Sequence, residues 1–305
     1  MPAAKKQQAV EIGGRSLTLT NPDKPMYPSG FTKGQVIDYY LRAADTLLPH
    51  LQRRPVTLKR YPNGVKGRYF YEKDAPSFTP EWVETFPVPR REGGPEIRYI
   101  VIGDLPSLVW CANLASLELH PFLYRVPNLQ RPDSVVFDLD PGERAGILDC
   151  ARVALLLKEA LAARGLECFA KVSGSKGIQV YAPLHTAVTF QATRRFAHGL
   201  AEQFERRHPD QVVSKMAKDL REGKVFIDWS QNSDFKTTAA VYSLRASRES
   251  PFVSVPVAWQ ELEAAGKSGE ASVLDFDPAA ALARIERLGD LFAPVLELKQ
   301  KLPAG

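Results

Sequence analysis

The sequence predicts an α+β fold in which helices pack on one side of a mixed β-sheet. The second half of the chain supports this class, because short β-prone runs alternate there with longer segments of helical periodicity. The first half supports it too, since one long helical pattern stands among several short strands that turn residues separate. With 305 residues, of which 44% are hydrophobic and 25% charged, the chain is long enough to bury a sizeable core.

The first half begins with residues 1–14, which predict a short loose lead-in. A helix is predicted at 32–51, because Thr32 is a suitable N-cap and apolar side chains recur at helical spacing after it. Strands are also predicted in this half, with turn signals such as YPNG and EGGP between them. They lie at 16–20, 55–61, 96–102 and 116–120.

The second half follows a Pro-containing loop at 121–133, where we expect an N-terminal module (1–130) to meet a second module (131–305). Its first strand, at 134–139, leads into a helix at 147–164 that Gly165 closes. The tail is rich in Pro and Ala and predicts one or two further helices. The remaining predicted elements are strands at 166–172, 177–184, 224–230 and 238–244 and a helix at 191–207.

The composition limits the cellular setting. The longest apolar runs are interrupted by charge well short of the roughly 20 residues that a membrane span needs, so we expect no membrane segment. The N-terminal residues lack the apolar core of a secretory signal, which favours a cytoplasmic protein. The cysteines, Cys111, Cys150 and Cys168, have no CxxC spacing, so we expect core thiols rather than disulfides or a zinc site.

Basic residues gather in two segments, 58–73 and 214–224. A net charge of +5 and a pI near 9.0 favour a polyanionic partner without establishing one. The first segment interleaves its cations with tyrosine and phenylalanine, and such a surface can meet phosphates and stack on bases. The same segment also fits a strand with aromatic residues on one face and solvated charges on the other. Both interpretations stay open at this point.

The stretch SVVFDLDPGE places two carboxylates, Asp138 and Asp140, at the end of a predicted strand. Side chains two apart in a strand point to the same face, about 6–7 Å apart along the chain. Two such carboxylates repel each other unless a cation lies between them, and oxygen ligands suit Mg²⁺ or Mn²⁺. An exposed turn is the alternative, because Asp and Pro-Gly also favour turns.

Asp228 adds a third carboxylate near the end of another β-prone run, KVFIDWSQN. A carboxylate there is unusual in a buried sheet without a partner, and three acids on neighbouring strands are what a two-metal phosphoryl-transfer site needs. A salt bridge to a nearby basic residue is the alternative. The small residues of the turn in VSGSKGIQVY let it approach a phosphate closely, although it also fits a simple hairpin turn.

Further motifs join these along the chain, in the order TNPDKPMYPSGFTK, LKRYPNG, FYEK, LELH, VVFDLDPGE, SGSKGIQVY and KVFIDWSQN followed by KTTAAVYSLRA. Taken together, they resemble the polymerase domain of bacterial ATP-dependent ligase D, within the archaeo-eukaryotic primase superfamily. The similarity runs in order across nearly the whole chain. The resemblance implies a primase-type palm with an RRM-like mixed sheet and an N-terminal α/β module packed against it, all within a single catalytic domain.

The resemblance also implies a function. It implies a template-dependent nucleotidyltransferase that adds ribo- or deoxyribonucleotides to primers at DNA gaps and double-strand-break ends, by a two-metal mechanism with Mn²⁺ or Mg²⁺. The implied partners are nucleoside triphosphates and gapped or broken DNA with a 5′-phosphate, which the enzyme would meet on the nucleoid. Ku and a DNA ligase are further partners that end joining implies, since nothing in the chain resembles the KxDG nucleotidyl-lysine motif of a ligase.

The functional residues of the family map onto positions of this sequence one by one. The triad that binds metal and carries catalysis maps onto Asp138, Asp140 and Asp228. A 5′-phosphate pocket is implied at Asn21, Lys24 and Lys33, with its neighbouring template contacts in the N-terminal module, and a primer or template contact is implied at Arg221. The residues implied to bind the nucleotide are Lys59, Arg60, Phe70, Tyr71, His120, Ser173, Lys176, Gln179 and Arg245.

One position departs from the family pattern. The family usually has a histidine in SGSKGLHxY, where this chain has Gln179. Glutamine donates a hydrogen bond but carries no positive charge, so we expect weaker nucleotide binding or a stricter metal requirement. Two other functions stay open: a metal-dependent nuclease that uses the same acids, and a non-catalytic DNA-end-binding or bridging module that needs none of them.

Overall fold

The computed structural model describes residues 7–303, and these residues form two compact units. Unit 1 contains the residues up to Pro121 together with Tyr242–Val253 and Asp277–Gly289. Unit 2 contains Phe122–Val241, Ser254–Phe276 and the residues from Asp290 onward. The chain therefore passes between the units more than once. The sequence predicts a single boundary at residue 130, so it does not predict that later segments return to unit 1.

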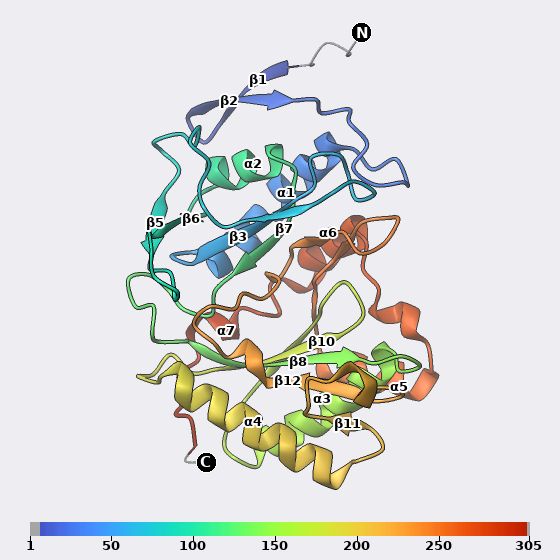
Figure 1. The fold of residues 1–305 in the computed structure, drawn as a ribbon. Coiled ribbons are helices and arrows are strands. Elements are labelled where there is room, and N and C mark those ends of the chain that lie inside the picture. The colour runs from blue at the N-terminus through green and yellow to red at the C-terminus, as the bar shows by residue number, and fades with distance from the viewer. Residues whose placement is uncertain (1–6, 304–305) are drawn as a thin grey trace. The chain divides into compact units, whose positions relative to one another are not determined.

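Unit 1 is built on a five-stranded antiparallel sheet (Figure 1). Four strands follow the spatial order β4, β3, β6, β5, and β7 also pairs with β3. The strands predicted near 55–61, 96–102 and 116–120 are confirmed, whereas the sequence pattern does not predict β4 and β5. The bounds are β3 Pro55–Arg60, β4 Phe70–Glu72, β5 Thr85–Val88, β6 Ile97–Val101 and β7 Ser116–Pro121.

Two helices of unit 1, α1 (Lys33–Leu51) and α2 (Leu105–Asn113), pack against each other. The first is the predicted helix, and a capping box fixes its start. The Thr32 side chain accepts a hydrogen bond from the Gln35 backbone, and the Gln35 side chain accepts one from the Thr32 backbone. Nearly all side chains of α2 are buried, so it lacks the polar face that would reveal a helix in the sequence.

The first described residues form a hairpin of β1 (Gln7–Ile12) and β2 (Arg15–Thr20). The prediction of a loose lead-in is therefore wrong for residues 7–12, and residues 1–6 lie outside the described part of the chain. Gly13 and Gly14 make the turn with φ values of 55° and 73°, which glycine adopts at little cost. Unit 1 also contains β13 (Leu244–Arg245), β14 (Phe252–Val253) and α6 (Pro278–Leu288).

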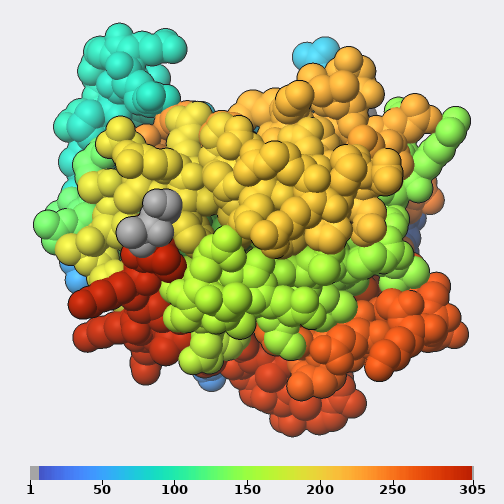
Figure 2. All heavy atoms as spheres, turned by 90° about the horizontal axis from the view of Figure 1, so that it is seen from below, coloured from blue at the N-terminus to red at the C-terminus, as the bar shows by residue number. Residues whose placement is uncertain are grey.

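Unit 2 is built on a six-stranded mixed sheet in the order β11, β12, β8, β10, β9, β15. Only β11 and β12 pair in parallel. Two helices, α3 (Ile147–Ala162) and α4 (Phe190–Arg207), pack against β8, and Figures 1 and 2 show them side by side below the sheet. The predicted α+β class with a mixed sheet is confirmed. The strand bounds are β8 Ser134–Pro141, β9 Phe169–Val172, β10 Ile178–Pro183, β11 Val212–Val213, β12 Val225–Asp228 and β15 Pro256–Val257.

Some predictions for the second half are wrong. The predicted strand at 238–244 is irregular up to Ser243, because its apolar side chains are buried without pairing in a sheet. The predicted strand at 224–230 ends at Asp228, whose carboxylate accepts a hydrogen bond from the Ser230 backbone and starts a short 3₁₀ turn. The tail forms more helices than expected: α5 (Trp259–Ser268), α6 and α7 (Pro294–Glu297).

The cysteines are buried and free, as the sequence predicts for core thiols. Across residues 7–303, the helices are too short or too polar to cross a membrane.

Candidate active site

Unit 2 carries the predicted metal-binding acids on two neighbouring strands. Asp228 of β12 lies directly opposite Asp138 of β8, and Gln179 of β10 lies opposite Asp138 on its other side. Lys171 of β9 comes next, opposite Gln179. Side chains at directly opposed positions share one face of a sheet, so these four form a polar row. Asp140, two residues along β8, lies on the same face, and the structure thus brings the three predicted acids together on that face.

The Asp138 carboxyl lies in a strongly negative environment. Its pKa is raised to about 7, first by burial and then by the carboxylates of Asp140 and Asp228. A hydrogen bond from Gln179 and the charge of Lys171 oppose this rise. Like charges therefore face a buried carboxyl, as expected where carboxylates gather to receive a cation.

Asp228 is engaged by its own loop. Its Oδ1 accepts hydrogen bonds from the Ser230 backbone N–H at 2.9 Å and from the Ser230 hydroxyl, and Lys236 Nζ lies 3.6 Å from Oδ2. In this conformation, no group of three or more His, Cys, Asp or Glu side chains within residues 7–303 is arranged to hold a metal ion.

Two buried amide oxygens beside these acids have no hydrogen-bond partner within the described chain, Gln179 Oε1 and Gln231 Oε1. The amide nitrogen of Gln231 lies 3.4 Å from a carboxylate oxygen of both Asp138 and Asp228. Buried polar atoms normally find a partner, and oxygen atoms are the ligands that Mg²⁺ and Mn²⁺ prefer. The residue types gathered here, three carboxylates with two amide side chains beside them, are therefore ones that a divalent cation prefers.

The turn that the sequence predicts to approach a phosphate lies between β9 and β10. Ser173 Oγ accepts hydrogen bonds from the backbone N–H groups of Ser175 at 3.3 Å and Gly177 at 3.2 Å, so two donors of the turn are already used. A Cβ at Gly177 would lie 2.2 Å from the Leu139 carbonyl oxygen, so only glycine lets the turn close against β8. Lys176 is exposed. The turn therefore offers mainly side-chain donors to an anion.

Arg221, the predicted primer or template contact, lies in the loop between β11 and β12. Gly142 lets this loop approach the end of β8, because a Cβ there would lie 1.8 Å from the Arg221 carbonyl oxygen. The Arg221 guanidinium donates to the Met216 carbonyl at 2.5 Å and lies 3.7 Å from the centre of the Phe226 ring. The structure places Arg221 beside the end of β8 that carries Asp140.

Unit 1 gathers three of the predicted nucleotide-binding side chains around one buried carboxylate, Glu118 of β7. Lys59 Nζ lies 3.1 Å from Glu118 Oε1. His120 Nε2 and Arg245 Nε each lie 3.0 Å from Glu118 Oε2. Burial lowers the pKa of His120, which favours its neutral form at pH 7. Glu118 is not among the predicted site residues. It interrupts the β-prone run LELH as Asp228 interrupts KVFIDWSQN, so the same sequence signal marks both carboxylates.

The exposed aromatic residues Phe70 and Tyr71 lie on opposite faces of β4, because successive side chains of a strand alternate. Tyr71 lies opposite Lys59, and the Lys59 Nζ is 5.6 Å from the centre of the Tyr71 ring. The Tyr71 ring also packs edge-on against the His120 ring, with 6.2 Å between the ring centres. Phe70 lies opposite Arg60, whose guanidinium is 5.2 Å from the Phe70 ring centre. The structure thus groups Tyr71, Lys59 and His120 and separates Phe70 and Arg60 from them.

The residues predicted to hold a 5′-phosphate lie around the start of α1 in unit 1. Asn21 adopts a φ of 50° in a turn, and its carbonyl accepts a hydrogen bond from the Lys24 backbone at 3.1 Å. The buried Lys33 donates to the Thr20 hydroxyl at 2.9 Å. The pKa of Lys33 is lowered to about 8, first by burial and then by the charges of Lys24 and Arg60. A buried lysine that faces other cations makes a site that an anion would stabilise.

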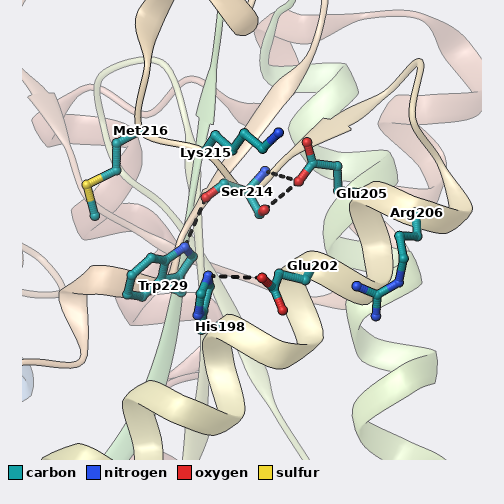
Figure 3. A pocket seen from close by; sticks show the side chains of 8 residues that line it. All are labelled: His198, Glu202, Glu205, Arg206, Ser214, Lys215, Met216 and Trp229. Carbon is teal, nitrogen blue, oxygen red and sulfur yellow. Dashed lines mark hydrogen bonds and ion pairs between the residues drawn. The ribbon is translucent and has the colours of Figure 1, made fainter.

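A cavity of about 600 Å³ lies between α4 and the loop after β11, and Figure 3 shows its lining. None of the predicted site residues lines it. Glu205 accepts a hydrogen bond from the Ser214 hydroxyl at 2.5 Å, Trp229 donates to the Ser214 carbonyl at 3.0 Å, and His198 Nε2 lies 3.5 Å from Glu202. Two carboxylates, Glu202 and Glu205, and two cations, Arg206 and Lys215, line the cavity, so its lining shows no strong excess of positive charge.

Comparison with known proteins decides the family. Residues 32–292 match the model of the family described as "LigD, primase-polymerase domain". The chain belongs to this family. The LigD primase-polymerase chain is 40% identical over 280 residues to the Mycolicibacterium smegmatis protein named "Multifunctional non-homologous end joining protein LigD", covering 91% of this chain and 36% of that protein. It is 34% identical over 250 residues to the Bacillus subtilis "Bifunctional non-homologous end joining protein LigD", covering 81% of this chain and 39% of that protein.

A solved structure agrees with this family. It is described as "Polymerase Domain from Mycobacterium tuberculosis Ligase D in complex with DNA" and is 38% identical to this chain, with a TM-score of 0.85. The match covers 93% of this chain and 99% of the other. The fold that the sequence resemblance implies is therefore confirmed. The chain spans little more than a third of the length of its curated LigD relatives.

Two further charged side chains, Lys171 and Lys236, interact with the acids and are not predicted from the sequence. Lys171 is 1% exposed and donates to the Ala239 carbonyl at 2.9 Å and to Ser254 Oγ at 2.7 Å. The sequence could have marked Lys171, because it stands inside the β-prone run LECFAKV. Lysine is rarely buried without partners, so a lysine in a buried strand indicates a specific interaction. The other is Lys236, which faces Asp228. It follows an irregular loop, and no periodic pattern marks it.

Asp138→Asn is expected to stabilise the metal-free LigD primase-polymerase chain increasingly as the pH rises from about 4 to about 7. Above pH ~4 the unfolded state has released the Asp138 proton, whereas the folded state keeps it up to the raised pKa. The stability of the parent therefore falls as pH rises through this window, and asparagine escapes that loss. Thermal unfolding midpoints in EDTA should coincide at about pH 4 and differ by about 3–6 °C at about pH 8. A difference that does not change with pH would contradict the assigned repulsion.

Proposed function

We propose that this chain is a template-dependent nucleotidyltransferase that extends primer 3′ ends at DNA gaps and double-strand-break ends. The observation that carries the proposal is the face of the unit 2 sheet on which Asp138, Asp140 and Asp228 meet. Membership of the LigD primase-polymerase family supports it, and so do the names of relatives in non-homologous end joining. A similar polymerase domain solved with DNA supports a nucleic-acid substrate.

In this proposal the three aspartates would hold two divalent cations, Mn²⁺ or Mg²⁺. Such ions activate the attacking hydroxyl and stabilise the charge on the leaving group. The protein keeps the carboxylates in place, because β8 and β12 are paired in register. In the reaction, the primer 3′ oxygen forms a bond to the α-phosphorus, and the bond from that phosphorus to the pyrophosphate oxygen breaks.

Other residues contribute charge and stacking. In unit 2, Ser173 and Lys176 would donate to triphosphate oxygens, and Arg221 would hold the primer or template backbone. In unit 1, charged and polar side chains would contact phosphates, and the exposed rings of β4 would stack on bases. The unit 1 residues proposed for the nucleotide are Lys59, Arg60, Phe70, Tyr71, His120 and Arg245, and those proposed for the 5′-phosphate are Asn21, Lys24 and Lys33.

Because the chain spans little more than a third of its LigD relatives, the joining step is proposed for other domains or proteins. A DNA ligase would seal the filled gap, and Ku would hold the broken ends. The chain proposed here would supply the missing nucleotides.

Extension of a labelled primer on a gapped duplex tests the proposal. The expected result is templated extension in Mn²⁺, stronger when the far side of the gap carries a 5′-phosphate, with ribo- and deoxyribonucleotides and Mg²⁺ compared in parallel. Shortening of the primer would indicate the nuclease alternative. Tight DNA binding without any change of length would indicate the non-catalytic end-binding alternative.

Gln179→His is expected to lower the apparent KM for nucleotide by about 2–10-fold. Gln179 lies beside Asp138 in the polar row, and a histidine there can add positive charge next to the triphosphate. The comparison uses single-nucleotide addition in Mn²⁺ at two pH values, because the charge of histidine depends on pH. An unchanged or higher KM would contradict the hypothesis that a histidine at this position binds the phosphates of the nucleotide.

A further inference from the structure

Ser214 immediately follows β11, and three elements of unit 2 meet at this residue. Its hydroxyl and its backbone N–H both donate to Glu205 Oε2 of α4, at 2.5 Å and 3.3 Å. Its carbonyl accepts a hydrogen bond from the Trp229 indole at 3.0 Å, and Trp229 directly follows Asp228 at the end of β12 (Figure 3). Ser214 is 5% exposed, so water competes little with these bonds. The start of the loop between β11 and β12 is therefore fixed to α4 and to the end of β12.

The residues that follow Ser214 depend on this anchor. Lys215 to Leu220 are exposed, and Lys215 and Met216 line the cavity of about 600 Å³ that lies between the loop and α4. An exposed segment beside a cavity has few packing contacts, so its hydrogen bonds largely decide where it lies. A hydrogen bond to a carboxylate is roughly twice as strong as one between neutral groups. The bond from Ser214 to Glu205 is therefore a strong tie for this half of the loop.

The side chain of Arg221 is held by the same half of the loop. Its Nη2 donates to the carbonyl of Met216, two residues after Ser214, at 2.5 Å. Its guanidinium also lies over the Phe226 ring, 3.7 Å from the ring centre. The Met216 carbonyl takes one of the five N–H groups of an arginine, and a phosphate can accept from others. A series of contacts thus leads from Ser214 through the Met216 carbonyl to the Arg221 guanidinium.

We propose that Ser214 is a positioning residue: through the Met216 carbonyl it orders Arg221 for the phosphate backbone of the primer or template strand. Arginine loses rotamer freedom when a ligand orders it, and the loss is smaller when the side chain is already held. This inference rests on the proposed nucleotidyltransferase function, in which Arg221 holds the DNA backbone, and adds to it the group that arranges Arg221. In this proposal Ser214 does not contact the DNA. Loss of its hydroxyl should weaken DNA binding and leave nucleotide binding unchanged.

A double-mutant cycle of Ser214→Ala and Arg221→Met tests this role. The parent, both single variants and the double variant are titrated onto a labelled primer-template duplex without nucleotide, and fluorescence anisotropy at one fixed salt concentration gives the Kd. Arg221→Met should raise the Kd about 10-fold or more. Ser214→Ala should raise it about 5–10-fold in the parent and less than about twofold in the Arg221→Met protein, because its effect passes through Arg221.

Thr193→Val is the matched control. Thr193 lies on α4, the helix that carries Glu205, and its buried hydroxyl donates to the Phe190 carbonyl at 3.1 Å. Its replacement should leave the Kd within about twofold of the parent. If Ser214→Ala does not fold, Glu205→Gln takes its place in the cycle. Glutamine keeps an acceptor but loses the charge that strengthens the bond, so the Kd should rise about 2–4-fold in the parent and not in the Arg221→Met protein.

The readouts separate positioning from structural support. A Kd that Ser214→Ala leaves unchanged in the parent, or raises equally in both backgrounds, would overturn the proposal. An equal loss in Thr193→Val or an Arg221→Met protein that binds DNA as tightly as the parent would also overturn it. Binding of a fluorescent nucleoside triphosphate should stay within about twofold of the parent in Ser214→Ala, and a parallel loss there would contradict an effect through Arg221. A parent that binds the duplex but extends no primer would overturn the proposed function and leave the cycle to judge Ser214. A parent that does not bind DNA would overturn both.

Discussion

Asp138→Asn and Asp228→Asn are each expected to reduce primer extension about 1,000-fold or more while DNA binding stays within about twofold of the parent. Each change removes one negative charge from the acid face with little change of shape. The two residues lie directly opposite each other on paired strands. Each carboxylate is fixed in its own place by its strand, so we expect that one cannot take over the role of the other. Extension of a labelled primer in Mn²⁺ at saturating nucleotide gives the rate, and fluorescence anisotropy of labelled duplex gives the binding.

Asp234→Asn is the matched control for this loss. Asp234 lies in the loop that follows β12, and its carboxylate accepts a hydrogen bond from Gln130 at 3.3 Å, a residue outside the polar row. The control should extend primers within about twofold of the parent. Residual extension within tenfold of the parent in Asp138→Asn would show that the acids of this face are not the metal site.

Lys171→Met is expected to lower the free energy of unfolding by about 2–4 kcal/mol. Lys171 is almost fully buried, and its ammonium donates to the Ala239 carbonyl and to Ser254 Oγ. Methionine fills a similar volume but leaves the buried carbonyl without this donor. The charge of Lys171 also lowers the pKa of Asp138, so the variant should need a higher pH for full activity.

Urea unfolding of Lys171→Met and Lys158→Met measures this effect. Lys158 is a partly exposed lysine of α3 that lies 3.8 Å from Glu263, and its replacement should change stability by less than about 0.5 kcal/mol. Lys171→Met within the same range would contradict the assigned role of the buried ammonium.

The second half of the fold is largely predictable from the sequence, because its strands and helices carry different periods. The run at 134–139 and the amphipathic pattern at 191–207 both appear as elements with bounds close to those expected. Elements that lack one apolar and one polar face show no hydrophobic periodicity, so the sequence does not predict them. The helix α2 is buried almost throughout, and residues 238–243 are buried without forming a strand.

The candidate site is predictable where a charge interrupts an apolar strand. Asp138 and Asp228 stand out in this way, and strand register brings them together. The same signal marks Glu118 and Lys171, but their partners come from distant segments such as Arg245 and Ser254, which periodicity does not connect. The separation of Phe70 from Tyr71 follows from strand alternation once β4 is known to be a strand.

Primer extension with one nucleotide at a time tests the central claim most directly. The parent protein is incubated in Mn²⁺ with a gapped, 5′-phosphorylated duplex and each of the four nucleotides separately, and the length of the labelled primer is measured. Lengthening with the nucleotide that pairs with the template base, and not with the other three, is the expected result. A primer that stays unchanged, is shortened, or is extended equally by all four nucleotides would contradict template-dependent nucleotidyl transfer.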